Sequence, residues 1–265
     1  MGKGMVYLVG SGPGDPDLLT VKALRLIQSA DVIFYDRLVS DEILALIPKG
    51  VSRFMVGKAS GHHCVPQQEI NQLLVNAADK NRTIIRLKGG DPYIFGRGSE
   101  EALELHKHGI KFEVIPGITA ASGCSSYAGI PLTHRGLSRS VQFITGHFRE
   151  DEPLEINWEK LVDPQTTLVF YMGLSSLDYI CQSLMKAGLD ADIAAAAVQN
   201  GTTHQQNRLI SNVSHLADAV KESGMQAPVM IIIGEVVTLA DDLNWFISSA
   251  DEIQLEQEVY ESGIA

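Results

Sequence analysis

Short runs of β-branched residues alternate with helical patterns in the first half of the chain, and this alternation constrains the fold most. The strand-like runs lie at residues 5–9, 31–35, 83–87 and 112–115. Between them, apolar residues recur at helical spacing, as at Leu19, Ala23, Leu26 and Ala30. A second helical pattern is entered through Pro66, which suits a first helical turn. The order of strand, helix and strand predicts a mostly parallel sheet.

A second series of strands and helices follows Pro131. Strands are expected at residues 140–145, 167–171, 193–198, 207–210 and 229–233, and helices at 175–187 and 214–223. The segment 130–134 contains a proline and interrupts the periodicity, so we place the boundary there. A chain of 265 residues has room for two compact domains. We therefore predict two α/β domains, at residues 1–130 and 131–248, followed by an acidic tail at 249–265.

Charge and cysteine content exclude several classes of function. Lys plus Arg number 21 against 32 Asp plus Glu, which gives a net charge of −11 and argues against a nucleic-acid partner. The longest apolar stretches are too short to span a bilayer, so we expect no membrane partner. Cys64, Cys124 and Cys181 form no Cys-x-x-Cys pair, and His62 and His63 have no companion ligands at usable spacing. We expect no metal site and a cytoplasmic location.

The first predicted strand ends in a glycine-rich turn, residues 10–16, with the sequence Gly-Ser-Gly-Pro-Gly-Asp-Pro. Such a turn between a strand and a helix lets the backbone approach a ligand. A dinucleotide-binding Gly-x-Gly-x-x-Gly pattern that starts at Gly10 fails at Asp15, and Pro13 lacks the N–H that a phosphate would use. Asp36, after the second strand, would be the ribose carboxylate of a nicotinamide enzyme. We keep that interpretation as the second choice.

Two further clusters follow predicted strands. Residues 86–98 contain four glycines, more than a structural turn needs, and Asp91 could accept hydrogen bonds from a ribose or an amine. This pattern favours ligand contact. Residues 115–123 contain Thr119, a candidate helix cap, followed by small residues. Small side chains suit either a flat ligand close to the backbone or tight packing, and the spacing supports both interpretations equally.

A long window of the chain lacks acidic residues. Residues 114–149 contain no Asp or Glu, but they hold a set of basic side chains: Arg135, Arg139, Arg149, His134 and His147. Arginine pairs with carboxylates and phosphates through two parallel hydrogen bonds. The window therefore suits either a local anion site or a run of packing residues with scattered surface arginines. Composition does not separate the two.

Several of these motifs together resemble the two signatures of the tetrapyrrole methylase family. The signatures are residues 6–16, Val-Tyr-Leu-Val-Gly-Ser-Gly-Pro-Gly-Asp-Pro, and residues 86–92, Arg-Leu-Lys-Gly-Gly-Asp-Pro. Further matching segments are 35–40, 56–58, 116–123, 129–135, 169–173 and 200–202, so the resemblance runs from about residue 5 to Phe246. It is far more specific than a lone glycine motif.

The resemblance implies a fold, a cofactor and a reaction. The fold is that of two α/β domains of the tetrapyrrole methylase type, with the ligand cleft between them, in a homodimer. The cofactor is S-adenosylmethionine, which leaves as S-adenosylhomocysteine. The reaction passes two methyl groups in succession to the tetrapyrrole uroporphyrinogen III and gives precorrin-2, a precursor of sirohaem and cobalamin.

The resemblance also implies roles for individual residues. Residues that match the family's cofactor-binding positions are Pro13, Gly89, Gly90, Asp91, Ile94, Thr119, Ala120, Met172 and Gly201. Asp36 and Lys58 match positions for a proton acceptor and a proton donor. With the acid-free window, the substrate's eight carboxylates suggest Arg37, Arg135, Arg139 and His147 as substrate-binding residues. Asp36 could instead pair with Arg37 as a structural ion pair, and Lys58 could be only a partner of a substrate carboxylate.

Three competing hypotheses remain beside this one. The first is a nicotinamide-dependent reductase, from Gly10, Gly12 and Asp36. The second is a catalytically idle tetrapyrrole-binding protein, and the third is a family member that methylates a precorrin at another carbon. No dehydrogenase and chelatase module precedes residue 1, so we expect a stand-alone methylase.

Overall fold

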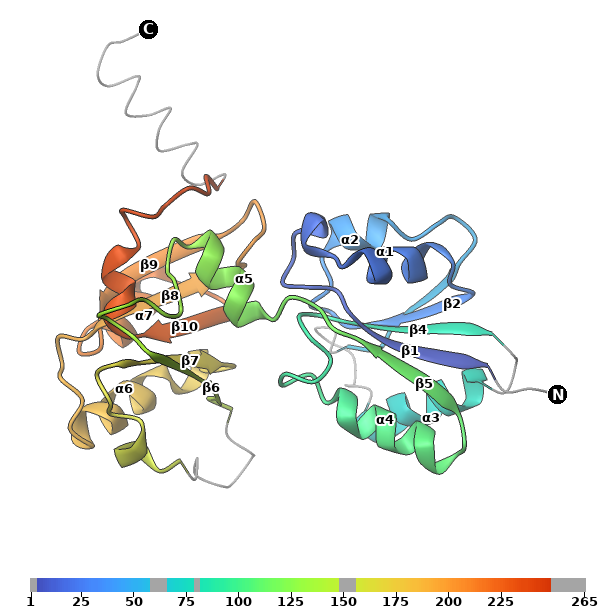
Figure 1. The fold of residues 1–265 in the computed structure, drawn as a ribbon, viewed down its shortest axis with the longest axis horizontal. Coiled ribbons are helices and arrows are strands. Elements are labelled where there is room, and N and C mark those ends of the chain that lie inside the picture. Colours follow the sequence, from blue (N-terminus) through green and yellow to red (C-terminus); the bar gives the residue numbers. More distant parts are fainter. Residues whose placement is uncertain (1–3, 58–65, 79–81, 148–155, 249–265) are drawn as a thin grey trace, which may run out of the picture. The chain divides into compact units, whose positions relative to one another are not determined.

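The computed structural model describes residues 4–57, 66–78, 82–147 and 156–248. The chain divides into two compact units, Met1–Ala120 and Ala121–Ala265, which we call the N-terminal and C-terminal units (Figure 1). Lys58 and the acidic tail at 249–265, both named from the sequence, lie outside the described residues.

The N-terminal unit is built on a five-stranded sheet in the order β3-β2-β4-β1-β5. All of its strand pairs are parallel. The strands are β1 (Met5–Gly10), β2 (Val32–Tyr35), β3 (Ser52–Met55), β4 (Thr83–Lys88) and β5 (Lys111–Ile115). The predicted parallel sheet is therefore confirmed, with β3 as an additional edge strand.

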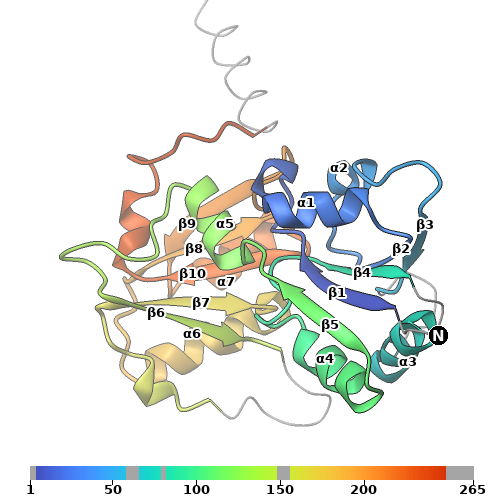
Figure 2. The ribbon, with the colours of Figure 1, turned by 45° about the vertical axis from the view of Figure 1, so that its right-hand side comes forward.

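Helices cover both faces of this sheet (Figures 1 and 2). On one face lie α1 (Val21–Gln28) and α2 (Asp41–Ala45), and on the other α3 (Gln67–Ala78) and α4 (Gly98–Lys107). A short 3-10 helix, η1 (Pro16–Leu18), precedes α1. The side chains of Thr20 and Ser40 cap α1 and α2 by accepting hydrogen bonds from main-chain N–H groups one turn later.

Strand β4 shows how the sequence builds two cores on one sheet. Ile85 and Leu87 point into the apolar layer beneath α1 and α2, whereas Ile84 points into the layer beneath α3 and α4. Because side chains alternate along a strand, Arg86 and Lys88 share the face of Ile84. Two cations therefore enter a layer that is otherwise apolar.

The C-terminal unit contains a mixed sheet in the order β6-β7-β10-β8-β9. The pair β6 and β7 is parallel, whereas β10 runs antiparallel to both of its neighbours and β9 runs antiparallel to β8. The strands are β6 (Ser140–Thr145), β7 (Thr166–Tyr171), β8 (Ala194–Gln199), β9 (Asn207–Asn212) and β10 (Val229–Ile233). All five were predicted, to within two residues at each end.

Helices also cover both faces of the second sheet. The main apolar core joins α6 (Leu177–Lys186) and α7 (Leu216–Ser223) to one face through β7, β8 and β10. On the opposite face, the Tyr171 hydroxyl accepts a hydrogen bond from Ala121 N of α5 (Ala120–Tyr127) at 3.1 Å. Short 3-10 helices complete the unit: η2 (Trp158–Lys160), η3 (Leu174–Ser176) and η4 (Glu235–Leu239).

The division between the units falls ten residues before the boundary that we placed at residue 130. The reason is α5, whose carboxyl-terminal end is held by the second unit. Tyr127 O accepts from Gln206 Nε2 at 3.0 Å, and Ala128 O accepts from Arg208 Nη1 at 3.1 Å. The proline at 131 thus interrupts the chain after, and not before, the first helix of the C-terminal unit.

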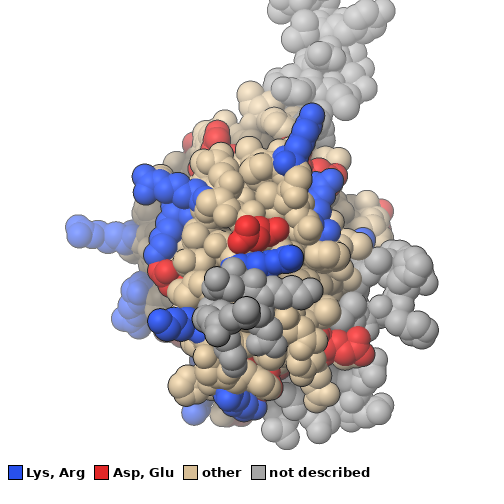
Figure 3. All heavy atoms as spheres, turned by 90° about the vertical axis from the view of Figure 1, so that its right-hand side faces the viewer, with Lys and Arg blue, Asp and Glu red and all other residues tan. Residues whose placement is uncertain are grey.

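The described surface carries charged side chains of both signs (Figure 3). In the described atoms of the face shown in Figure 3, several Lys and Arg side chains lie along one margin, and others are scattered over the face together with Asp and Glu. Within the ranges that the structure describes, no helix is long and apolar enough to cross a membrane.

Candidate active site

The glycine-rich loops meet at the carboxyl edge of the N-terminal sheet, where β4, β1 and β5 are neighbours. Ser11 N donates to Lys88 O at 2.8 Å, Gly12 N donates to Gly90 O at 3.1 Å, and Gly90 N donates to Gly12 O at 2.7 Å. The chain then leaves β1 toward α1 on one face and leaves β4 toward α4 on the other (Figure 1). Such a divergence of neighbouring strands is where open α/β sheets bind ligands.

Three glycines allow the loops to touch through their main chains. A Cβ atom on Gly10 would lie 2.6 Å from both Gly117 N and Gly90 O. A Cβ atom on Gly117 would lie only 2.3 Å from Gly90 O. Gly90 itself has a φ of +67°, and a Cβ there would meet only Ala120 N, at 3.6 Å. Gly10, Gly90 and Gly117 form what we call the glycine junction, and the open side of Gly90 leaves bare backbone beside it.

Asp91 fastens the loop after β4 to the loop after β5. Its Oδ1 accepts from Tyr93 N at 2.8 Å, and its Oδ2 accepts from Gly117 N at 3.1 Å. We predicted Asp91 as an acceptor for a ligand. The structure gives both of its oxygens a main-chain partner within the loops, so any ligand bond would be made in addition to these.

The loop that follows Asp91 carries unusual backbone conformations. Phe95 and Arg97 have φ values of 52° and 58°, a region that side chains other than glycine rarely adopt. Ile94 is half-buried between them and Asp91. Arg97 pairs with Glu100 at 2.7 Å, and this hydrogen bond lowers the pKa of the Glu100 carboxyl. Backbone strain of this kind gathers at functional sites.

Asp36 lies at the same edge and belongs to a buried ion network. Its Oδ1 accepts from Arg86 Nη2 at 2.5 Å, and its Oδ2 lies 3.8 Å from Lys88 Nζ. Behind them, Glu101 Oε1 accepts from Arg86 Nε at 2.9 Å and from Lys88 Nζ at 3.1 Å. Gln67 Nε2 also donates to this oxygen, at 3.2 Å. The predicted alternative for Asp36, a structural ion pair, thus exists with Arg86 and Lys88, and the structure describes no such pair with Arg37.

Burial and charge act in opposite directions on the two cations. Burial alone would lower the pKa of Arg86, but the carboxylates of Asp36 and Glu101 raise it above its ordinary value. For Lys88, burial is the largest cause and Arg86 adds to it, so the pKa of Lys88 is lowered. Arg86 is therefore a permanent cation of the network.

Sequence reasoning missed this network. The resemblance pointed to Asp36, while Arg86 and Lys88 were taken only as part of a ligand loop. The available signal was their spacing: two cations at positions i and i+2 of an apolar strand must share one buried face and need a carboxylate there. Glu101 could not be found in this way, because the sequence did not predict α4.

The C-terminal unit has its own set of candidate residues at one edge of its sheet. His147, Met172 and Gly201 follow the carboxyl ends of β6, β7 and β8. Met172 is 49% exposed with a φ of 56°, and Asn200 and Thr202 on either side of Gly201 also have positive φ. A Cβ atom on Gly201 would lie 2.3 Å from Cys124 Sγ of α5. The structure thus brings together the predicted residues of this unit that follow strands.

Arg135 and Arg139 lie elsewhere. Arg135 belongs to the turn between His134 and Ser138, and Arg139 immediately precedes β6. Arg139 is exposed and lies 3.9 Å from Asp163. Because β6 has six residues, about 20 Å of strand separates Arg139 from His147. The acid-free window is therefore not one local anion site within this unit.

The remaining predicted residues occupy the loops of the N-terminal unit. Pro13 is half-buried in the turn after β1. A Cβ atom on Gly89 would lie 2.7 Å from Leu38 Cβ, so Gly89 packs against the loop that carries the exposed Arg37. Thr119 and Ala120 are half-buried and follow β5, next to the open side of Gly90.

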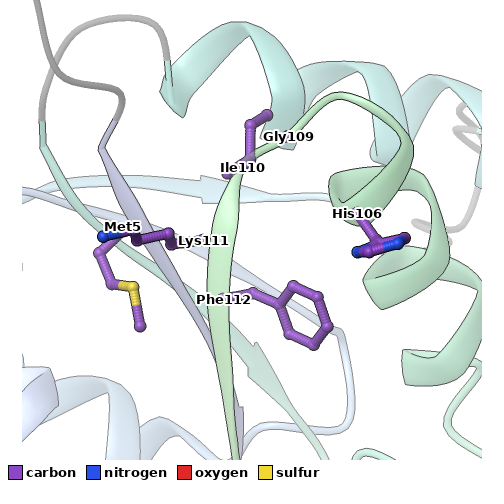
Figure 4. Close-up of a pocket in the computed structure, with 6 residues that line it drawn as sticks. All are labelled: Met5, His106, Gly109, Ile110, Lys111 and Phe112. Carbon is purple, nitrogen blue, oxygen red and sulfur yellow. The ribbon is translucent and has the colours of Figure 1, made fainter.

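A shallow hollow lies at the opposite edge of this sheet (Figure 4). It is lined by Met5, His106, Gly109, Ile110, Lys111 and Phe112, where β1 and β5 begin. Its position at the amino ends of the strands sets it apart from the glycine junction. The described residues contain no group of three or more side chains that could hold a metal ion.

Comparison with known proteins decides the family. The model of the tetrapyrrole (corrin/porphyrin) methylases matches residues 5–217. The chain belongs to the tetrapyrrole methylase family. This tetrapyrrole methylase has the two-sheet α/β fold that the motifs implied, and the predicted family and fold class are confirmed.

Several solved structures and curated proteins are similar to this tetrapyrrole methylase. A uroporphyrin III C-methyl transferase from Thermus thermophilus is 38% identical with a TM-score of 0.76, and the match covers 89% of this chain and all of that one. A cobalt precorrin-4 methyltransferase is 26% identical with a TM-score of 0.78, covering 88% of this chain and 95% of that chain. The siroheme synthase of Pseudoalteromonas atlantica is 53% identical over 249 residues. That match covers 94% of this chain but 54% of the synthase, so the chain spans about half the length of this curated relative.

Proposed function

We propose that the chain is an S-adenosylmethionine-dependent C-methyltransferase that adds two methyl groups in succession to uroporphyrinogen III, giving precorrin-2 for sirohaem and cobalamin biosynthesis. The T. thermophilus relative, whose whole length the match covers, is named for this type of substrate. The same protein has been solved in complex with S-adenosyl homocysteine, at 38% identity to this chain. The siroheme synthases support the pathway.

The hydrogen bonds between the loops after β1 and β4 support S-adenosylmethionine as the cofactor. The N–H groups of Ser11, Gly12 and Gly90 already donate to carbonyl oxygens of the facing loop, and Pro13 has no N–H to offer. A diphosphate needs free N–H donors at such a loop. A sulfonium cation needs none and tolerates the carbonyl oxygens and the Asp91 carboxylate nearby. This argues for S-adenosylmethionine over a nicotinamide dinucleotide.

The residues of both units then take the roles that the resemblance implied. The proposed cofactor-binding residues are Pro13, Gly89, Gly90, Asp91, Ile94, Thr119, Ala120, Met172 and Gly201. The open side of Gly90 provides a cradle that a Cβ atom would fill. Bound there, S-adenosylmethionine supplies an electrophilic methyl group, and the loops orient it for in-line attack. Such positioning removes about 7 to 11 kcal/mol of barrier in favourable cases.

Asp36 is the proposed proton acceptor, with Lys58 as the proposed donor. Asp36 is 26% exposed at the carboxyl edge, so substrate can reach its carboxylate. It takes the proton that the pyrrole must lose after the new carbon–carbon bond forms, a kind of help worth about 10² to 10⁴ in rate. Arg37 and His147, which follow the carboxyl ends of β2 and β6, are the proposed partners of substrate carboxylates, whereas Arg135 and Arg139 lie at the other end of β6 and are no longer proposed. A cytoplasmic homodimer completes the proposal.

One experiment tests the function directly. The protein is incubated without oxygen with uroporphyrinogen III and methyl-labelled S-adenosylmethionine, and the tetrapyrrole is weighed by mass spectrometry. We expect a gain of two methyl groups. A gain of one methyl group, or methylation only of a later precorrin, would favour the third hypothesis from the sequence. Heat on titration with NADH but not with S-adenosylmethionine would favour the reductase.

A further inference from the structure

Glu101 is a fully buried carboxylate that the proposed reaction does not use. It lies in the first turn of α4, with none of its side chain exposed. Its Oε1 accepts three hydrogen bonds, from Arg86, Lys88 and Gln67, while Oε2 has no hydrogen-bond partner in the part of the chain that the structure describes. Burying a carboxylate in this way is costly unless opposite charges compensate it.

The charges of the network balance only when Asp36 is counted. Arg86 and Lys88 are each 2% exposed and contribute two positive charges. Glu101 neutralises one of them, and Asp36, at the rim of the network, neutralises the other. The carboxylate at the rim is therefore tied through two cations to a carboxylate in the interior.

We propose that Glu101 is a positioning residue for Asp36: it holds the Arg86 guanidinium against the Asp36 carboxylate and balances one of the two buried cations, so that Asp36 remains able to take up a proton. The inference rests on the proposed role of Asp36 in the methylation. Glu101 does not touch the substrate in this account. It acts through Arg86 and Lys88.

The sign of the effect follows from the surrounding charges. The described charged groups that face this end of the network are Arg86 and Lys88 on β4 and Glu101 and Glu100 on α4, while α3 contributes the neutral Gln67. Without the charge of Glu101, two cations face one carboxylate. A proton taken up by the Asp36 carboxylate would then leave two buried cations with no opposing charge, which disfavours the transfer.

The test compares two single variants and their combination. Glu101→Gln keeps the shape of the side chain but removes its charge, so we expect kcat to fall about tenfold and the acid limb of the pH profile to move about one unit lower. Lys88→Met removes one cation, so the limb should move the opposite way. The double variant restores the balance, and its limb should return toward that of the wild type. The KM for S-adenosylmethionine should stay unchanged in all three.

Glu104→Gln is the matched control, because Glu104 lies on the same helix but pairs with Lys107 at the surface. It should leave the pH profile of kcat unchanged.

The carboxyl ¹³C resonance of Asp36, assigned with Asp36→Asn and titrated without ligand, gives the same shifts without any turnover. A wild type that methylates nothing would refute the proposed function, while this titration would still test the network. Unchanged pH dependence in Glu101→Gln, or shifts of the same sign in Glu101→Gln and Lys88→Met, would overturn the inference. If Glu101→Gln does not fold, Lys88→Met alone tests the inference: a shift of its acid limb to higher pH supports it, and a shift to lower pH or no shift overturns it.

Discussion

At the scale of single residues, two glycines of the glycine junction are required for different physical reasons. Gly117 is needed because another backbone occupies the space of its Cβ, whereas Gly90 is needed for its left-handed conformation and its open side. Both look alike in the sequence. Only the structure shows which one lies against another backbone and which one has an open side.

The variants Gly117→Ala and Gly90→Ala should therefore differ. In Gly117→Ala the new Cβ would meet Gly90 O, which cannot move without shifting the loop, so we expect a loss of about 3 kcal/mol in the free energy of unfolding. In Gly90→Ala the cost is the left-handed conformation alone, about 1 to 2 kcal/mol. Binding of S-adenosylhomocysteine to Gly90→Ala should nevertheless weaken at least about tenfold, which is 1.4 kcal/mol.

Urea unfolding and isothermal calorimetry measure the two effects. Full binding by a stably folded Gly90→Ala protein would mean that the open side of Gly90 does not face the cofactor. A Gly117→Ala protein as stable as the wild type would mean that the loops can separate more easily than their contacts indicate.

Individual site residues were predictable to different degrees. The glycine loops and Asp36 could be named from motifs, because a motif is continuous in the sequence. The partners of Asp36 could not, because Glu101 reaches Arg86 only through the packing of α4 on the sheet. The separation of Arg139 from His147 was equally hidden, since composition shows which charges are close in the chain but not that a strand holds them apart.

At the scale of elements, most strands of both sheets were predicted because buried apolar runs rich in β-branched residues carry a strong signal, as in β4 and β10. The exceptions have physical reasons. Strand β3 is an exposed edge strand with the sequence Ser-Arg-Phe-Met, so it has no apolar run. Helix α4 begins at Gly98 inside a glycine-rich segment, and α2 has only five residues. The mixed direction of the second sheet was also unpredicted, because β9 follows β8 without a helix and β10, which comes after α7, is inserted between β7 and β8.

The start of α1 offers a test at this scale. Thr20 Oγ1 accepts from Ala23 N at 3.1 Å where α1 begins, after the loop that follows β1. Replacement of Thr20 by Ala should lower the free energy of unfolding by about 1 kcal/mol, whereas Thr20→Ser should retain most of it. Urea unfolding measures both. Equal losses in the two variants would assign the effect to the lost methyl group and not to the cap.

At the scale of the whole molecule, two buried cysteines of the C-terminal unit link the stability of the protein to pH. Burial raises the pKa of the Cys124 thiol to about 12, and that of Cys181 to about 12, from an ordinary value of 9.0. Both thiols therefore stay protonated in the folded protein at neutral pH, and neither is a candidate nucleophile.

A raised pKa in the folded state means that the unfolded chain loses these protons first. The stability linked to the two thiols is present below pH 9 and should be lost progressively as the pH rises toward 12. Denaturant unfolding between pH 8 and 11 measures this decline. At pH 8 a thiol reagent should modify neither Cys124 nor Cys181 until denaturant is added. Rapid labelling of both in the native protein would show that α5 and α6 open far more readily than their packing suggests.

The glycine junction also bears on how such an enzyme could be re-engineered. Gly10, Gly90 and Gly117 meet through main-chain atoms alone. The side chains of their exposed neighbours Tyr93 and Ile118 can therefore be replaced without disturbing these contacts. A library aimed at a different acceptor can vary those two positions widely. In a library that also varies Gly10 or Gly117, most variants would fail to form the loops, because a side chain at either position would collide with backbone atoms.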